Sequence, residues 1–395
     1  MNHRERLLTA LNGGIPDKVP TFDWFDEPVI YGVAELLGLE VPEKKEGMTR
    51  HGEEDEEALD LFIDVIKALG MDGVWHSYSV EMETIAEGYG RDNYGKTYMF
   101  SDFGEPLITD APLKHKTSID GFDMVSKLKE SDVEKAVYVK ERLPHHAHAL
   151  GLSGPFQETW RIRGGMDLLM QDFIVRPKFV HDMMRMTTDF NREIISLAAK
   201  YDFDFIMVDG DLAGNTTSLI SLPHFEEFIF PYKKELCDHA HSLGLKMVKH
   251  CDGVVWPLMN YFIEAGFDGF HPVQPQCMDI GMTKKYLKER VCVLGNIDCL
   301  DLLVFRGPGE VRQAVKDTIA IAAPEGGYIL CSSNSLHPGC KPENVLAMME
   351  AVDEFGWYDN IPSVAPPAAD PPALINGTPP PRVRKSKRRR SLAVG

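Results

Sequence analysis

The sequence predicts a (β/α)₈ barrel, because eight short apolar runs end in polar or glycine residues and helical segments separate most of them. Such alternation of near-continuous apolar strands with helices is typical of a parallel sheet covered by helices, and eight units can close into a barrel. A doubly wound open sheet is the alternative, but no glycine-rich phosphate loop follows the first strand. The expected strands span residues 19–23, 71–75, 147–152, 204–208, 245–249, 267–271, 291–295 and 327–331.

The N-terminal stretch MNHRERLLTALNGG predicts an amphipathic helix that Asn2 caps and that Gly13 and Gly14 end. It lacks the apolar region of a signal peptide, and no run of about 18 apolar residues follows. The seven cysteines are an odd number and all lie at or after Cys237, which favours reduced thiols. We therefore expect a cytoplasmic protein without a transmembrane span.

Two segments depart from simple strand–helix alternation. Residues 80–135 are too long for a plain crossover, and EGYGRDNYGKTYMFSDFGEPLITD (87–110) predicts a hairpin inserted after the second strand as a rim or lid element. From Ile361 the chain holds eight prolines followed by a basic run. This composition predicts a barrel domain over residues 1–360 and a disordered tail over residues 361–395.

Charge is spread unevenly along the chain, whose formal net charge is −18. The tail from Ile361 carries +6, which leaves −24 on residues 1–360. An acidic body repels nucleic acid and polyanionic ligands. The sequence therefore favours a neutral or weakly charged substrate, or a basic protein partner, and no nucleic acid.

Polar side chains follow seven of the eight expected strands. In a (β/α)₈ barrel the chemistry lies at the C-terminal ends of the strands, although loops begin there and are polar in any case. We expect these residues to converge on one mouth. Three tryptophans beside them are candidates for walls around a flat substrate, although plain barrel packing is the more common role for each. The polar residues are Asp23, His76, Asp209, Asp211, His250, Asp252, Gln274, Asn296, Asp298, Asn334 and His337, and the tryptophans are Trp24, Trp75 and Trp160.

The fifth expected strand ends in the run His250-Cys251-Asp252. Because side chains alternate faces along a strand, His250 and Asp252 should face the mouth while Cys251 packs outward under a helix. A histidine and a carboxylate suit a catalytic zinc, which needs three protein ligands. A metal-free His–Asp dyad, in which Asp252 fixes the imidazole tautomer, is the alternative. Residues near the eighth strand that can supply the third ligand are Asn334, His337, Cys331 and Cys340.

The remaining candidates have simpler expected roles. Asp209 in VDGDLAG is a candidate general acid or base, whereas Asp211 more readily caps the turn that follows. His145, His146 and His148 precede or lie within the third strand, away from the mouth, and are expected to be structural. The side chains expected to contact substrate are Asp23, Trp24, His76, Trp160, Gln274 and Asn296.

Four segments resemble the uroporphyrinogen decarboxylase superfamily, in order and spacing, from about residue 3 to 358. They are RERLLTALNGGIPDKVPTFDW (4–24), SLPHFEEFIFPYKKELCDHAHSLGLKMVKHCDG (221–253), FIEAGFDGFHPVQP (262–275) and GGYILCSSNSLHPGCKPENVLAMMEAV (326–352). The resemblance implies a (β/α)₈ barrel and one of two chemistries. One is decarboxylation of uroporphyrinogen, and the other is zinc-dependent methyl transfer with a corrinoid protein.

The residues separate these two chemistries. True uroporphyrinogen decarboxylases carry an arginine-rich segment after the first strand, whereas residues 7–49 contain no arginine here. The methyltransferases take zinc from a His-x-Cys after the fifth strand and a Cys after the eighth. His250 matches this pattern, but Asp252 and Asn334 stand where the two cysteines belong. Such a harder ligand set suits an oxygen substrate better than a thiol.

We therefore expect a methyltransferase that moves a methyl group from a small O-methylated (or N- or S-methylated) substrate to the cobalt of a corrinoid protein. Zinc is the expected cofactor, with His250 and Asp252 as ligands completed by Asn334 or His337. The enzyme alternative is a decarboxylase acting on another acid. A barrel that binds a tetrapyrrole or small aromatic without catalysis is the non-enzyme alternative. The sequence leaves the oligomeric state open, with a homodimer as one option.

Overall fold

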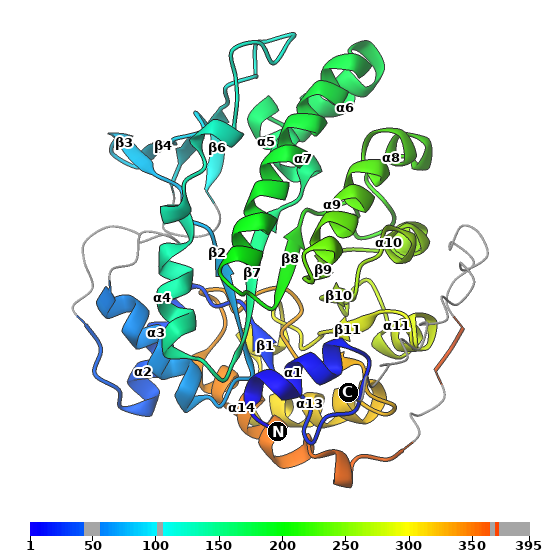
Figure 1. The fold of residues 1–395 in the computed structure, drawn as a ribbon. Coiled ribbons are helices and arrows are strands. Elements are labelled where there is room, and N and C mark those ends of the chain that lie inside the picture. The colour runs from blue at the N-terminus through cyan, green and yellow to red at the C-terminus, as the bar shows by residue number, and fades with distance from the viewer. Residues whose placement is uncertain (43–55, 101–105, 364–367, 371–395) are drawn as a thin grey trace, which may run out of the picture.

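The structure is a computed structural model that describes residues 1–42, 56–100, 106–363 and 368–370. Eight parallel strands form one sheet in the order β1-β2-β7-β8-β9-β10-β11-β12, and helices surround it (Figure 1). All eight expected strands are present, so the (β/α)₈ barrel is confirmed. The strands are β1 (Phe22–Asp23), β2 (Gly73–Ser77), β7 (Ala147–Ser153), β8 (Phe205–Asp209), β9 (Lys246–His250), β10 (Gly269–His271), β11 (Cys292–Leu294) and β12 (Tyr328–Ile329).

The helices follow the strands in chain order, with more than one helix after each of β1, β7, β8 and β11. The expected N-terminal helix is present, and the Asn2 side chain accepts from the Glu5 N–H while the Glu5 side chain accepts from the Asn2 N–H. The helices are α1 (His3–Leu11), α2 (Glu27–Leu37), α3 (Glu56–Ala68), α4 (Glu134–Arg142), α5 (Pro155–Arg163), α6 (Met166–Val175), α7 (Pro177–Lys200), α8 (Leu222–Phe228), α9 (Phe230–Ser242), α10 (Met259–Ala265), α11 (Ile280–Leu287), α12 (Leu302–Phe305), α13 (Pro308–Ala322) and α14 (Pro342–Phe355).

Two apolar layers lie on the two faces of the strands. Side chains such as Phe205 and Val248 fill the barrel interior, where Leu7 and Leu11 of α1 join them. Neighbours along the same strands, such as Ile206 and Met247, belong to the larger layer between strands and helices. Because successive side chains point to opposite faces, the face of each strand-end residue follows from its position.

The insertion after β2 is larger than the expected hairpin. It forms a four-stranded antiparallel sheet of β3 (Met82–Ala86), β4 (Tyr89–Asp92), β5 (Thr97–Met99) and β6 (Leu107–Asp110). A buried lysine attaches this sheet to the barrel, since Lys96 Nζ lies 3.2 Å from Glu158 Oε2 of α5 and 3.4 Å from Asp92 Oδ2. In Figure 1 the sheet lies at the end of the molecule that also holds α5 and α6, opposite α1.

The seam between β1 and β12 closes the barrel although each strand has only two residues. Backbone bridges join Thr21 to Leu330 and Phe25 to Leu336. Between them the buried Asp23 carboxylate accepts from Ser332 N (2.7 Å), Ser332 Oγ (2.8 Å) and Trp24 N (3.0 Å). Burial, which outweighs these hydrogen bonds, raises the pKa of Asp23 to about 7.

Most of the expected disordered tail, residues 361–395, lies outside the described residues, so its disorder stays a prediction. Across the described ranges, no helix has the length and apolar character needed to cross a membrane.

Asp23 should make stability depend on pH. Because its pKa is raised from 3.8 in the unfolded chain to about 7 in the fold, its contribution is full below about pH 4 and is lost as pH rises toward 7. We expect this contribution to be roughly 2–4 kcal/mol, and Asp23→Asn should remove that part of the pH dependence. Urea unfolding at pH 4, 5.5 and 7 measures it. An unchanged slope in Asp23→Asn would place the titrating group elsewhere.

Candidate metal site at the barrel mouth

The end of β9 places its side chains as the alternation predicts. His250 follows Val248 on the interior face and is buried at the mouth. Cys251 lies in the layer under the helices, where its Sγ accepts from Leu212 N at 3.4 Å. Asp252 returns to the mouth and is half-buried. The run His250-Cys251-Asp252 therefore offers a nitrogen and a carboxylate to the mouth, and its thiol faces away.

Three side chains form a candidate cation site. In the described part of the chain, Asp211, His250 and Asp252 are the one group of three His, Cys, Asp or Glu side chains whose ligand atoms all lie within 4.8 Å of one another. Asp211 Oδ1 accepts from Asp252 N at 2.9 Å, which fixes the two carboxylates side by side. We call these three residues the mouth triad.

Asp252 carries the clearest sign of a missing partner. Its Oδ2 accepts from Asn334 Nδ2 at 2.6 Å, whereas its Oδ1 is buried and has no hydrogen-bond partner among the described residues. Burial and the negative charges of Asp211 and Asp209 raise the pKa of Asp252 to about 6. A bound cation would satisfy both the orphan oxygen and the carboxylate repulsion, so these residues fit a divalent metal ion.

The two other residues expected as ligands have different surroundings. Asn334 donates to Asp252, so in this arrangement it orients a ligand. The ring nitrogens of His337 are both engaged, Nε2 with Cys299 O (2.8 Å) and Nδ1 with Gly339 N (3.1 Å), and the structure does not bring this residue into the triad. Cys331 lies in the barrel interior and Cys340 in the outer layer. Asp211, which the sequence suggested as a turn cap, is the side chain that completes the group.

A second histidine holds His250, and sequence reasoning did not single it out. His250 Nδ1 lies 2.7 Å from Nδ1 of His271, which ends β10 directly beside it in the parallel register. Burial, with the charge of His250, holds the pKa of His271 well below its ordinary value, so this ring is neutral. His271 is the last residue of the expected strand 267–271. Its position at a strand end was the sequence signal that could have identified it as a site residue.

Asp209 lies on the other side of His250. Its Oδ1 is 3.7 Å from His250 Nε2, and its Oδ2 accepts from Gln157 Nε2 of α5 at 3.1 Å. Burial alone would raise the pKa of Asp209, but the charges of His250 and Arg161 outweigh it and lower that pKa below its usual value. Asp209 is therefore an ionised group that can orient the imidazole or accept a proton.

Aromatic rings wall the mouth on the β1–β2 side. The ring of Trp75 lies 6.0 Å from that of His250, 5.7 Å from His271 and 5.4 Å from Trp24. The two tryptophans also line a small cavity of about 80 Å³, together with Phe25, Phe62 and others. His76 borders this cavity too, with its Nε2 2.9 Å from His148 Nδ1 on the helix-facing side of β2. Trp75 borders this cavity and also lies against His250, but no residue of the mouth triad lines the cavity.

The other side chains expected to contact substrate already have partners within the protein. Gln274 Oε1 accepts from Gly253 N (2.9 Å), and buried Asn296 donates through Nδ2 to Val273 O (2.9 Å). Trp160 on α5 is half-buried and lies against the Arg161 guanidinium, 5.6 Å away. Asp23 is buried at the seam with Ser332. Their roles toward a substrate stay predictions.

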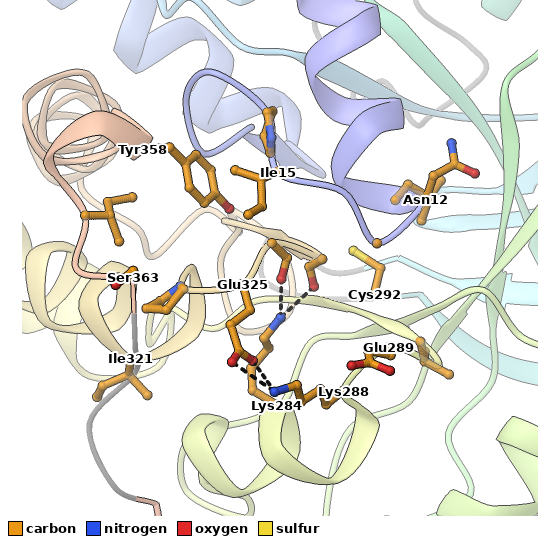
Figure 2. A pocket seen from close by; sticks show the side chains of 18 of the residues that line it. Asn12, Ile15, Lys284, Lys288, Glu289, Cys292, Ile321, Glu325, Tyr358 and Ser363 are labelled. Carbon is orange, nitrogen blue, oxygen red and sulfur yellow. Dashed lines mark hydrogen bonds and ion pairs between the residues drawn. The ribbon is translucent and has the colours of Figure 1, made fainter. Parts of the chain in front are cut away.

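A second cavity lies at the opposite end of the barrel. It has a volume of about 1070 Å³ and is lined by the N-terminal ends of strands, α11 and the chain around residues 357–363. Figure 2 shows Lys284 inside it, donating to the carbonyls of Gly326 and Gly327, and Lys288 paired with Glu325. Barrel enzymes place their chemistry at the C-terminal ends of the strands, so the mouth remains the better candidate site.

Comparison with known proteins assigns the chain to a family. A family model described as Uroporphyrinogen decarboxylase (URO-D) matches residues 2–355. A protein of that name from Methylococcus capsulatus is 24% identical over 230 residues, 55% of this chain and 62% of the relative. Another from Dichelobacter nodosus is 28% identical over 131 residues, 33% and 36% of the two chains. The matched segments thus span less than two thirds of these relatives.

A solved structure agrees with the fold. The structure titled methyltransferase from Methanosarcina mazei superposes with a TM-score of 0.71 at 20% identity, over 90% of this chain and 99% of the other. At this identity the likeness concerns the fold alone.

The mouth triad should bind one divalent ion per chain. We expect His250→Ala to abolish binding, Asp211→Asn and Asp252→Asn to weaken it at least tenfold, and Asn334→Ala to weaken it roughly 10–100-fold as a ligand-orienting group. His337→Ala is the matched control and should bind normally. Calorimetric titration of metal-stripped protein with Zn²⁺ measures each affinity. Normal binding in Asp211→Asn together with loss in His337→Ala would instead support the ligand set expected from the sequence.

Cys251→Ala should separate packing from ligation. The thiol packs under the helices, so we expect a loss of roughly 1–2 kcal/mol in the free energy of unfolding with unchanged metal affinity. Denaturant unfolding and the same titration give both values. Loss of metal in Cys251→Ala would mean that the strand register at this site is displaced by one residue.

Proposed function

Because the chain belongs to the uroporphyrinogen decarboxylase family, we propose that it is a methyltransferase of that family, which passes a methyl group from a small O-methylated substrate to a corrinoid protein. The observation that carries the proposal is the mouth triad, whose ligand set of one imidazole and two carboxylates contains no thiolate. Hard ligands of this kind leave a metal ion suited to an oxygen atom of the substrate.

The charges at the mouth argue against uroporphyrinogen itself. That substrate carries many carboxylates and needs several cationic groups for recognition. Here Asp209, Asp211 and Asp252 lie together at the mouth, and residues 7–49 contain no arginine. A polycarboxylate would meet repulsion at this site.

The residues have separable roles in the proposed reaction. His250, Asp211 and Asp252 would hold the cation, for which zinc is our candidate, and when bound it supplies Lewis-acid polarisation of the substrate oxygen. His271 holds the His250 ring at Nδ1, and Asp209 lies 3.7 Å from Nε2, the nitrogen left for the cation. Trp24 and Trp75 would cover the apolar part of the substrate and exclude water. The methyl carbon would leave the oxygen, which would keep the bonding electron pair and take up a proton. The same carbon would bond to the cobalt(I) of the partner's corrinoid, which would supply the electron pair of the new bond.

The partner and compartment follow from charge and thiols. The acidic body, −24 over residues 1–360, suits a corrinoid protein with a basic docking face. All seven cysteines are free, which suits a reducing cytoplasm.

Decarboxylation of another acid is the second candidate, because the curated relatives bear the name Uroporphyrinogen decarboxylase. Arg161 beside Asp209 is a cation near the mouth that such an acid would use.

Methyl transfer should be detectable with free cobalamin. Purified protein supplied with Zn²⁺, cob(I)alamin and a panel of methanol and methoxyphenols should form methylcobalamin, followed by its absorbance. His250→Ala should lower the rate at least 100-fold because it removes the imidazole ligand, and His337→Ala should keep it. Formation of coproporphyrinogen from uroporphyrinogen, or release of CO₂ from another acid without methyl transfer, would favour the decarboxylase instead.

A further inference from the structure

A fully buried lysine lies directly behind the mouth triad. Lys249 precedes His250 on β9, points to the helix-facing side of the strand and is 0% exposed. Its Nζ donates to Gly210 O (2.8 Å), to Val208 O (3.4 Å) and to His250 O. No carboxylate oxygen of the described residues lies within 4.0 Å of this nitrogen, so its partners are backbone carbonyls.

Packing alone does not explain this side chain. Lysine is almost never fully buried without a charged partner, because an ion leaving water loses several kcal/mol of hydration. A methionine or leucine would fill the same volume in the apolar layer under α9 without that loss. The three carbonyl contacts are therefore the distinguishing property of the position.

Those carbonyls belong to the two segments that carry the site. Val208 and Gly210 flank Asp209 and precede Asp211, and the third carbonyl is that of His250 itself. Lys249 thus ties the end of β8 to the end of β9 behind their acidic and imidazole side chains. Its positive charge also opposes the mutual repulsion of three carboxylates on the other side of the strands.

Neighbouring contacts complete this connection. Val254 N donates to Gly214 O at 2.9 Å, on the far side of the same loop. Gly253 allows the approach, because its φ is +86° and a Cβ there would lie 2.7–2.8 Å from backbone atoms of Ala213 and Gly214. We call residues 209–214 the acidic loop. Lys249 of β9 holds it near its start, and Val254, four residues beyond the end of that strand, holds it at Gly214.

We propose that Lys249 is a positioning residue, which holds the acidic loop against β9 so that Asp209 and Asp211 stay beside His250. The proposal rests on the proposed function in one respect, that the mouth triad is the working site. The placement of the loop itself is a property of the protein with or without a metal ion.

The test compares two buried lysines of the same layer. Lys249→Met keeps the length of the side chain and removes its donors. Lys233→Met is the matched control, because Lys233 on α9 is also buried (2% exposed) and has no hydrogen bond to the acidic loop. We expect Lys249→Met to keep its melting temperature within a few degrees, to raise hydrogen exchange of the acidic-loop amides at least tenfold, and to weaken Zn²⁺ binding roughly 10–100-fold. Lys233→Met should leave loop exchange and affinity unchanged.

Several results would overturn the proposal. The proposal is wrong if the acidic-loop amides of Lys249→Met exchange at the wild-type rate. It is also wrong if Lys233→Met raises their exchange as much as Lys249→Met does. If Lys249→Met does not fold, Lys249→Gln, which retains a donor, is measured in its place. If neither variant folds while Lys233→Met does, Lys249 serves global stability and the proposal is wrong. A wild-type protein that binds no Zn²⁺ contradicts the proposed metal site, whereas the exchange comparison still decides the role of Lys249.

Discussion

The alternation of side chains along parallel strands is the constraint on which the site depends. On β9 it sends Val248 into the barrel, Lys249 behind the strand and His250 into the mouth. The same rule then places Cys251 under the helices and Asp252 beside His250. The end of β9 thus supplies two of the candidate metal ligands and, on the opposite face, the ammonium group of Lys249. A shift of one residue would exchange these faces. The register of β9 therefore decides which side chains reach the mouth.

The register is in turn fixed by contacts between neighbouring strand ends. His271 pairs with His250 in the β9–β10 register, and their ring nitrogens meet at 2.7 Å. On the other side, Asp252 N reaches Asp211 after β8. The triad and His271 therefore come from the ends of three consecutive strands, β8, β9 and β10, while Asn334, which follows β12, holds Asp252.

The sequence predicts the fold well because each strand is a short apolar run with a polar end, and that signal is local. The insertion was expected as a hairpin and is a four-stranded sheet, whose strands of three to five residues are too short to give a clear alternation signal. At the site, His250, Asp252 and Asn334 were expected and lie together, since the ends of parallel strands meet at the mouth. The sequence favoured His337 over Asp211 as a ligand, whereas the structure brings Asp211 to the site. Which of the two points inward depends on contacts with residues distant in the chain, Asp252 for Asp211 and Cys299 for His337.

The inserted sheet is attached to the same helix that contacts the mouth. Lys96 fastens the sheet to Glu158 on α5, and Gln157 on the same helix bonds to Asp209. Undocking the sheet would leave the Glu158 charge buried without its cation, so the sheet and α5 behave as one body. Gln157 and Glu158 are consecutive residues of α5, so the contact to Asp209 and the anchor of the inserted sheet lie on one helix. Any displacement of the sheet would therefore carry with it the helix that holds Asp209.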